Sequence, residues 1–139
     1  MERKLRSMLA AGLLLFVLML TGCGQNGLSG KFEEDAVKEK SMTAVTYFNE
    51  RNYQGIIDMG NELFQESITE EQFKEVSDPY LDKCGDFVEI SKTVVLGNTN
   101  GQTGESFGGV VMVGKYEEGQ IQFTIAFNEQ MELVQFVIK

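Results

Sequence analysis

The chain has 139 residues, of which 21 are acidic and 12 basic, so its formal net charge is -9 at pH 7, and it contains no histidine. Clusters of lysine and arginine bind the phosphates of nucleic acids, so this acidic balance argues against a nucleic-acid partner. Histidine is the commonest metal ligand and the usual proton acceptor of serine hydrolases. We therefore expect no nucleic-acid partner, no metal and no cofactor.

The first 22 residues have the pattern of a secretory signal peptide. Arg3, Lys4 and Arg6 form a positive segment, and the apolar run 8–20 follows it. This run is shorter than the roughly 20 apolar residues that a membrane-spanning helix needs. The pattern predicts an export signal that is removed from the mature protein.

The signal ends in Leu20-Thr21-Gly22-Cys23, which resembles the bacterial lipobox, Leu-x-Gly-Cys. The resemblance implies a diacylglyceryl thioether on Cys23, cleavage before this residue, and often a further acyl chain such as palmitate on the new amino terminus. Each buried methylene contributes about 0.8 kcal/mol, so two or three chains hold a protein stably on a bilayer. We expect a lipid-anchored protein on the extracytoplasmic side of the cell membrane. The alternative is an ordinary cleaved signal followed by a chance cysteine.

Removal of residues 1–22 leaves 117 residues, enough for one domain with a modest core. The net charge becomes -11, because three basic residues and one acidic residue leave with the signal. Residues 23–34 are expected to form the lipidated cysteine and a flexible tether, which is rich in glycine and polar residues. Residues 35–139 are expected to form a single α+β domain.

Cys84 is the one cysteine that remains if Cys23 carries lipid, so an internal disulfide is excluded in the mature protein. A reactive thiolate needs a neighbour that stabilises its charge, and the sequence offers Lys83 but no histidine. We predict that Cys84 is a small buried hydrophobic residue. A redox role or an intermolecular disulfide is the alternative.

Two helices are predicted before residue 61. From residue 33 to residue 49, apolar side chains recur at intervals of three and four, which is typical of an amphipathic helix. A short helix follows over residues 53–59 and ends at Gly60. Leu63 and Phe64 then form a brief apolar patch.

A third helix begins at Thr69-Glu70-Glu71-Gln72, which has the form of a capping box. Asp78-Pro79 is expected to kink or restart this helix, because proline has no amide hydrogen to donate. Gly85 is expected to end it. The sequence therefore predicts three helices in its first half.

Four strands are predicted after residue 85, where apolar residues begin to alternate with polar ones. The first covers residues 88–96, and Asn100-Gly101 indicates a type I′ hairpin. The others cover residues 110–116, 121–127 and 131–138. Helices followed by antiparallel strands favour an α+β fold in which the helices cover one face of the sheet.

Several core and turn positions form a loose pattern: Phe48, Asn52-Tyr53, Ile68-Thr69-Glu70, Phe73, Gly85-Asp86-Phe87 and Phe127-Asn128. This pattern resembles the family called domain of unknown function 3887 over residues 36–139. The resemblance implies a bacterial exported protein with three helices on a curved four-stranded sheet, the cone-shaped fold of the nuclear transport factor two and cystatin-like superfamily. It supplies no catalytic residue.

The segment Gly104-Glu105-Ser106-Phe107-Gly108 matches the Gly-x-Ser-x-Gly nucleophile elbow. An elbow requires a strand before it, a helix after it and a histidine to accept the serine proton. Here a strand is predicted to follow, and the chain has no histidine. We interpret the match as a coincidence in a glycine-rich loop.

The expected function is that of a binding or interaction module for an apolar small molecule or a surface protein. Cone-shaped relatives often hold a pocket between sheet and helices, and we expect its lining to include Tyr53, Met59, Phe64 and Met112. The alternative is an isomerase-like or dehydratase-like enzyme that pairs a carboxylate with a tyrosine. The residues that offer these groups are Tyr47, Tyr53, Asp58, Tyr80, Asp82 and Tyr116.

A homodimer is a further expectation. Relatives of this shape often pair through the outer face of the sheet, and apolar residues exposed on strands 110–116 and 121–127 would favour such pairing.

Overall fold

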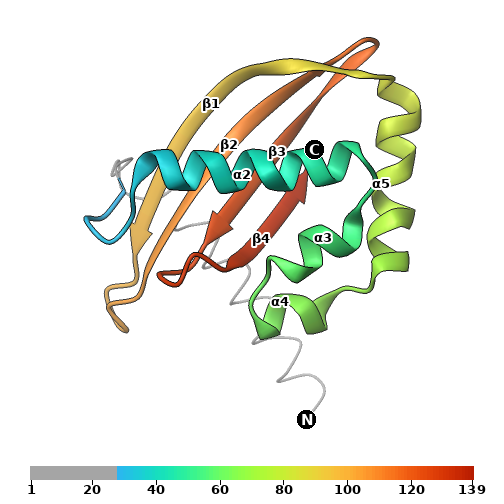
Figure 1. Ribbon diagram of the computed structural model, residues 1–139. Coiled ribbons are helices and arrows are strands. Elements are labelled where there is room, and N and C mark those ends of the chain that lie inside the picture. The colour runs from blue at the N-terminus through green and yellow to red at the C-terminus, as the bar shows by residue number, and fades with distance from the viewer. Residues whose placement is uncertain (1–27) are drawn as a thin grey trace.

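The structure is a computed structural model and describes residues 28–139. Four helices precede four strands in this part of the chain, and the helices lie on one face of the sheet (Figure 1). This confirms the predicted α+β class. The elements are α2 (Glu34–Asn49), α3 (Tyr53–Asp58), α4 (Glu62–Ser67), α5 (Glu70–Cys84), β1 (Phe87–Thr99), β2 (Ser106–Tyr116), β3 (Gly119–Phe127) and β4 (Leu133–Ile138).

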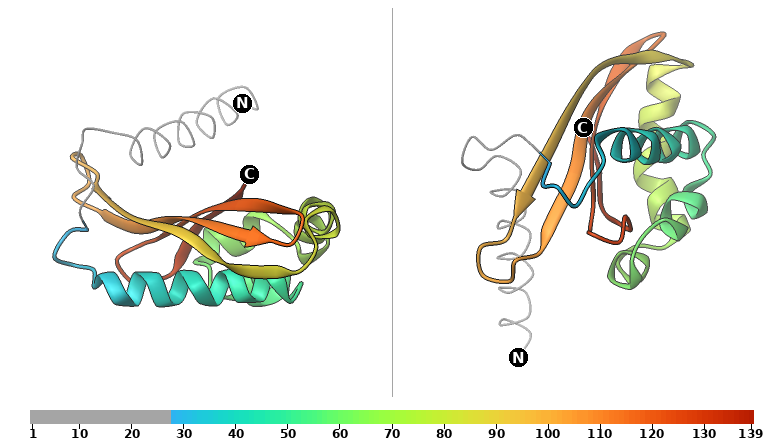
Figure 2. Two further views of the ribbon diagram at one scale, coloured as in Figure 1. Left: turned by 90° about the horizontal axis from the view of Figure 1, so that it is seen from above. Right: turned by 60° about the vertical axis from the view of Figure 1, so that its left-hand side comes forward.

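The sheet is antiparallel and open, with the strand order β1-β2-β3-β4. It is strongly curved around the helices, as the two views in Figure 2 show. Alternate residues of β2 and β3 point to the helices and are buried, including Val110, Met112, Phe123 and Ile125. No helix within residues 28–139 is long and apolar enough to cross a membrane.

The helix α4 differs from the sequence prediction of a brief apolar patch. Asn61 caps it by accepting a hydrogen bond from the amide of Phe64 at 2.9 Å. The helix has six residues, and none of them is fully buried. A helix this short has too few turns for its apolar residues to reveal a period, so the described part of the chain contains four helices where the sequence predicts three.

The helix α5 begins at the predicted capping box and runs through Pro79 without a break. The hydroxyl of Thr69 accepts from the amide of Gln72 at 3.1 Å, and the Gln72 side chain accepts from the amide of Thr69 at 3.0 Å. Pro79 leaves the carbonyl of Glu75 without its usual donor. Glu75 is exposed, so water is able to bond to this carbonyl.

The hairpin between β1 and β2 is wider than the predicted two-residue turn. Six residues, 100–105, separate the strands, and the amide of Asn100 donates to the carbonyl of Glu105 at 2.7 Å. The Asn100 side chain also accepts from the amides of Gln102 and Thr103. These bonds to the asparagine side chain fold a compact loop, and β2 therefore begins at Ser106, four residues before the predicted start.

The chain enters the domain along the inner face of β2. Phe32 is 8% exposed, and a side chain at Gly108 would collide with the side chains of both Leu28 and Phe32. Lys31 pairs with Glu129 at 2.5 Å. Residues 28–32 belong to the segment predicted as a tether, and the structure places them against the sheet.

Five aromatic rings from five elements meet between the helices and the sheet. The rings of Phe48 and Phe123 lie edge to face with centroids 5.2 Å apart, and Tyr53 stacks on Phe73, also at 5.2 Å. Phe136 of β4 packs against Phe48, Phe73 and Phe123 at 5.6–5.9 Å. This aromatic cluster joins three helices to β3 and β4.

The contribution of the capping box to the stability of the domain is measurable by mutation. Thr69→Ala removes the acceptor for the Gln72 amide, and we expect the free energy of unfolding to fall by about 1 kcal/mol. The measurement is urea unfolding at neutral pH. Thr43→Ala, at an exposed position of α2, is the control and should cost less; equal losses would show that the cap is unimportant.

Candidate functional site

A mostly apolar pocket of about 340 Å³ lies between α4, α5 and β4. This volume is at the lower end of the range for small-molecule sites, about 300–1,000 Å³. Carbon atoms from all three elements form its walls. The lining residues are Phe64, Ser67, Ile68, Phe73, Val76, Ser77, Phe136, Val137 and Ile138.

Backbone bonds to β4 fix one wall of the pocket. The amide of Leu133 donates to the carbonyl of Met59 at 2.9 Å, and the amide of Asn61 donates to the carbonyl of Leu133 at 3.1 Å. Asn61 then caps α4, and the ring of Phe64 covers Gly60 so closely that any side chain at Gly60 would collide with it. Phe64 is thereby held beside the last strand.

Ser77 forms part of the pocket and is completely buried, yet its hydroxyl has no hydrogen-bond partner within residues 28–139. Leaving a buried hydroxyl without a partner costs about 1–3 kcal/mol. Among the described residues that line the pocket, Ser77 is the one with a buried polar side-chain atom that lacks a partner. Ser41 of α2 is equally buried and also lacks a partner, but it does not line the pocket.

Four residues were predicted from the sequence to line a pocket, and one of them lines the pocket between α4, α5 and β4. Phe64 lines the pocket, whereas Tyr53, Met59 and Met112 do not. Tyr53 and Met112 are buried in the core, each 2% exposed, and Met59 is partly buried beside it.

Ser77 was not among the predicted pocket residues, although the sequence contains a signal for it. Phe73, Ser77 and Leu81 recur at intervals of four, so Ser77 is a polar residue on the apolar face of α5. Phe136, in the predicted strand 131–138, belongs to the aromatic cluster and also lines the pocket. Its second role depends on β4 being an edge strand, which the sequence does not specify.

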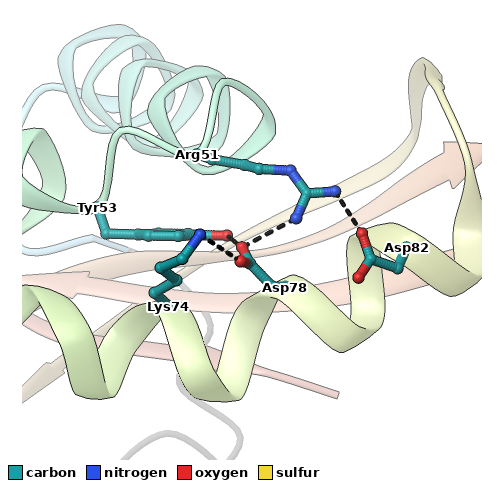
Figure 3. A network of polar contacts seen from close by, with 5 residues as sticks. All are labelled: Arg51, Tyr53, Lys74, Asp78 and Asp82. Carbon is teal, nitrogen blue, oxygen red and sulfur yellow. Dashed lines mark hydrogen bonds and ion pairs between the residues drawn. The ribbon is translucent and has the colours of Figure 1, made fainter.

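A polar network lies next to the pocket and joins the loop after α2 to α5 (Figure 3). Asp78 is at its centre. The Tyr53 hydroxyl donates to Asp78 Oδ1 at 2.5 Å, Arg51 Nη1 lies 2.9 Å from the same oxygen, and Lys74 Nζ lies 2.7 Å from Oδ2. Arg51 also donates to Asp82 at 2.8 Å. The carboxylate of Asp78 thus accepts a hydrogen bond from a phenol and forms ion pairs with two cations.

These contacts shift the pKa values of the pair in opposite directions. The hydrogen bond from Lys74, followed by that from Tyr53, lowers the pKa of Asp78 from 3.8 to about 2. Burial, followed by the bond to Asp78, raises the pKa of Tyr53 above its ordinary value of 10. At neutral pH the carboxylate therefore stays ionised and the phenol stays protonated, which is unsuited to proton exchange.

A second, polar crevice of about 360 Å³ lies at the end of α5, beside β1 and β2. Within it the Tyr116 hydroxyl donates to Asn49 Oδ1 at 2.5 Å, and burial raises the pKa of Tyr116. Arg51 and Asp82 also line this crevice, but they are already bonded to each other. We interpret this crevice as a gap in the packing where α2 and α5 meet the sheet, and not as a ligand site.

Ser106 and Cys84, two further residues considered in the sequence analysis, contribute to the packing of the domain. Ser106 begins β2 and its hydroxyl hydrogen-bonds that of Thr99 at 2.9 Å, with a strand following it as expected. Cys84 is a buried free thiol at the end of α5. Among the described residues, no three His, Cys, Asp or Glu side chains are grouped closely enough to hold a metal ion.

The outer face of the sheet mixes apolar and polar side chains. On β2, Val111 and Val113 are partly exposed there, and their partners across β3 are Thr124 and Gln122. Val94 of β1 is 38% exposed beside Val111. Pairing of two copies through this face stays a prediction.

The sequence matches the family described as "Protein of unknown function (DUF3887)" over residues 41–136. Among solved structures, the fold is similar to the NMR structure of a protein from Ruminococcus gnavus ATCC 29149, with a TM-score of 0.71 and 29% sequence identity. The similarity covers 81% of this chain and 96% of that one. No curated protein matches the chain.

The polar network predicts how stability depends on pH. Since the pKa of Asp78 is lower in the folded state than its ordinary value, its contribution is complete above about pH 4 and is lost as the pH falls towards 2. The Asp78 side chain is 20% exposed, so after solvent screening we expect Asp78→Asn to cost about 1–2 kcal/mol at pH 7. Urea unfolding at several pH values measures this cost.

The control is Glu75→Gln, which removes an exposed carboxylate from the same helix. Its effect on the free energy of unfolding should be smaller than that of Asp78→Asn at pH 7. A cost of Asp78→Asn that stays constant from pH 7 to pH 2 would contradict the assigned role of the carboxylate.

Proposed function

Because the chain belongs to the DUF3887 family, whose description states no function, we propose a role from its own geometry. The protein is a membrane-anchored extracytoplasmic lipoprotein that binds an apolar or amphipathic small molecule. The ligand occupies the pocket between α4, α5 and β4. Its polar group hydrogen-bonds the hydroxyl of Ser77.

The observation that carries this proposal is the combination of an apolar pocket with a buried, unpartnered hydroxyl. Ligand sites are mostly apolar, with a few polar groups that set orientation. A hydrogen bond from the ligand would remove the cost of the orphaned Ser77 hydroxyl. Phe73 and Phe136 are partly held by the aromatic cluster, so the walls of the site are largely formed before a ligand binds.

The location of the pocket follows from how the core is filled. We propose that the fold belongs to the cone-shaped superfamily of nuclear transport factor two and cystatin-like proteins. Its helices precede its strands and cover one face of a curved sheet, which supports this proposal. In this chain Phe48, Met112 and Phe123 occupy the centre between the layers. The mostly apolar pocket lies beside these residues, at the β4 edge.

The rival proposal, an isomerase-like or dehydratase-like enzyme, requires a carboxylate whose pKa is raised into the neutral range beside a tyrosine. Tyr53 and Asp78 have the required proximity, at 2.5 Å. The pKa of Asp78 is lowered instead, because Lys74 and Arg51 stabilise its charge. The pair is better explained as a clamp between α3 and α5.

Blocking the pocket tests the binding proposal. Val76 lines the pocket and is 57% exposed, so Val76→Glu should fold while placing a charge at the pocket mouth. We expect the affinity for N-phenyl-1-naphthylamine, a neutral apolar fluorophore, to fall about tenfold or more, because burying a charge in an apolar site is unfavourable. The measurement is a fluorescence titration of the full-length protein.

Val88→Glu is the matched control. Val88 is an apolar residue that is 51% exposed on β1 and does not line the pocket, so the same change in charge should leave the affinity nearly unchanged. If Val76→Glu and Val88→Glu bind the fluorophore with equal affinity, the fluorophore binds outside this pocket and the proposal is contradicted.

The lipid anchor has its own test. Cys23 lies outside the described residues, and its modification is proposed from the lipobox sequence alone. Cys23→Ala should move the protein from the membrane fraction to the soluble extracytoplasmic or medium fraction, and the intact mass of the native protein should show acyl chains on Cys23. A native protein that retains residues 1–22, or has a free Cys23 thiol, would contradict the anchor.

A further inference from the structure

We propose that the end of the domain that carries the β1–β2 loop, residues 100–105, faces the lipid bilayer and is held against it. The proposal rests on the anchor at Cys23 proposed above. Its new content is an orientation and an interaction surface, and it follows from where residues 28–32 lie on the fold.

The first step is that residues 28–32 are packed against the sheet near this loop. Phe32 is buried, and both Leu28 and Phe32 contact the position of Gly108, two residues after β2 begins. The Lys31–Glu129 ion pair adds a contact to the turn before β4. Figure 1 and the left view of Figure 2 show this segment at the same end of the sheet as the β1–β2 loop, away from the β2–β3 turn.

The second step is the length of chain that connects the packed segment to the anchor. Only residues 24–27 separate Cys23 from Leu28. Fully extended, these five Cα–Cα steps reach at most about 18 Å. The 13 residues of β1 span roughly 40 Å. The connection to Cys23 is therefore too short for the far end of the sheet to contact the bilayer in place of the near end.

The third step is the distribution of charge. Residues 34–84, which form the helix layer, contain twelve acidic and five basic side chains, and the β2–β3 turn contributes Glu117 and Glu118. An anionic leaflet repels both surfaces. The loop 100–105 contains one acidic residue, Glu105, and Glu129 nearby is paired with Lys31. The loop 100–105 therefore has fewer acidic residues than the β2–β3 turn, while Glu33, Glu34 and Asp35 lie at the same end as the loop, at the start of α2.

The experiment uses the full-length lipidated protein in vesicles of phosphatidylethanolamine and phosphatidylglycerol that contain a headgroup-spin-labelled lipid. A fluorophore is attached at Gln102→Cys in the loop or at Glu118→Cys in the β2–β3 turn. Both positions are exposed, and Cys84→Ala removes the native thiol. We expect at least about twofold stronger quenching at position 102, since position 118 lies roughly the length of the sheet farther away.

Two further variants test the cause of the orientation. Insertion of ten Gly and Ser residues after Gly24 lengthens the connection and should reduce the difference in quenching between the two positions. Phe32→Ser, which weakens the packing on Gly108, should reduce it as well, provided that its unfolding transition stays cooperative. Equal quenching at positions 102 and 118 in the unmodified chain, or a difference that the insertion leaves unchanged, overturns the proposal.

Vesicle flotation separates this proposal from the anchor. A protein that floats with the vesicles but shows equal quenching contradicts the orientation alone. A protein that does not float contradicts both the anchor and the orientation that depends on it.

Discussion

The contacts of Phe136 with three other rings are the interaction on which the rest of the structure depends. Phe136 comes from the edge strand β4 and meets Phe48 of α2, Phe73 of α5 and Phe123 of β3. Aromatic pairs of this geometry contribute about 0.5–1.5 kcal/mol each beyond the area they bury. They bring the last strand, the first described helix and α5 together, although these elements are far apart in sequence. The side chain of Phe136 thereby packs the edge strand β4 onto the core.

The same rings explain why a pocket lies where it does. Phe73 and Phe136 face the aromatic cluster and also line the pocket. Beyond them, α4 and the first half of α5 approach β4 without filling the space, because α4 is short and has no fully buried residue. The Tyr53–Asp78 bond fixes α5 against α3. The proposed ligand site is therefore an extension of the core, and its polar group, Ser77, is on the apolar face of a core helix.

The sequence predicts the order and type of the elements well because local signals mark them. The capping box at Thr69, the stop at Gly85 and the alternation of apolar residues in the strands all depend on neighbouring residues. Of the four residues expected to line a pocket, Phe64 lines the one between α4, α5 and β4, and the ligand site itself stays a prediction. Which apolar residue is core and which is pocket lining depends on the packing of α4 and β4, and no local pattern records that packing.

The central claim is that the buried hydroxyl of Ser77 serves a ligand. Ser77→Ala and Ser41→Ala remove two buried, unpartnered hydroxyls from two helices, and only Ser77 lines the pocket. We expect both changes to raise the free energy of unfolding by about 1 kcal/mol in the absence of ligand. In fluorescence titrations with N-phenyl-1-naphthylamine, whose amine is able to donate to the hydroxyl oxygen, Ser77→Ala should bind more weakly than the native protein and Ser41→Ala equally well. Unchanged binding by Ser77→Ala would contradict the account.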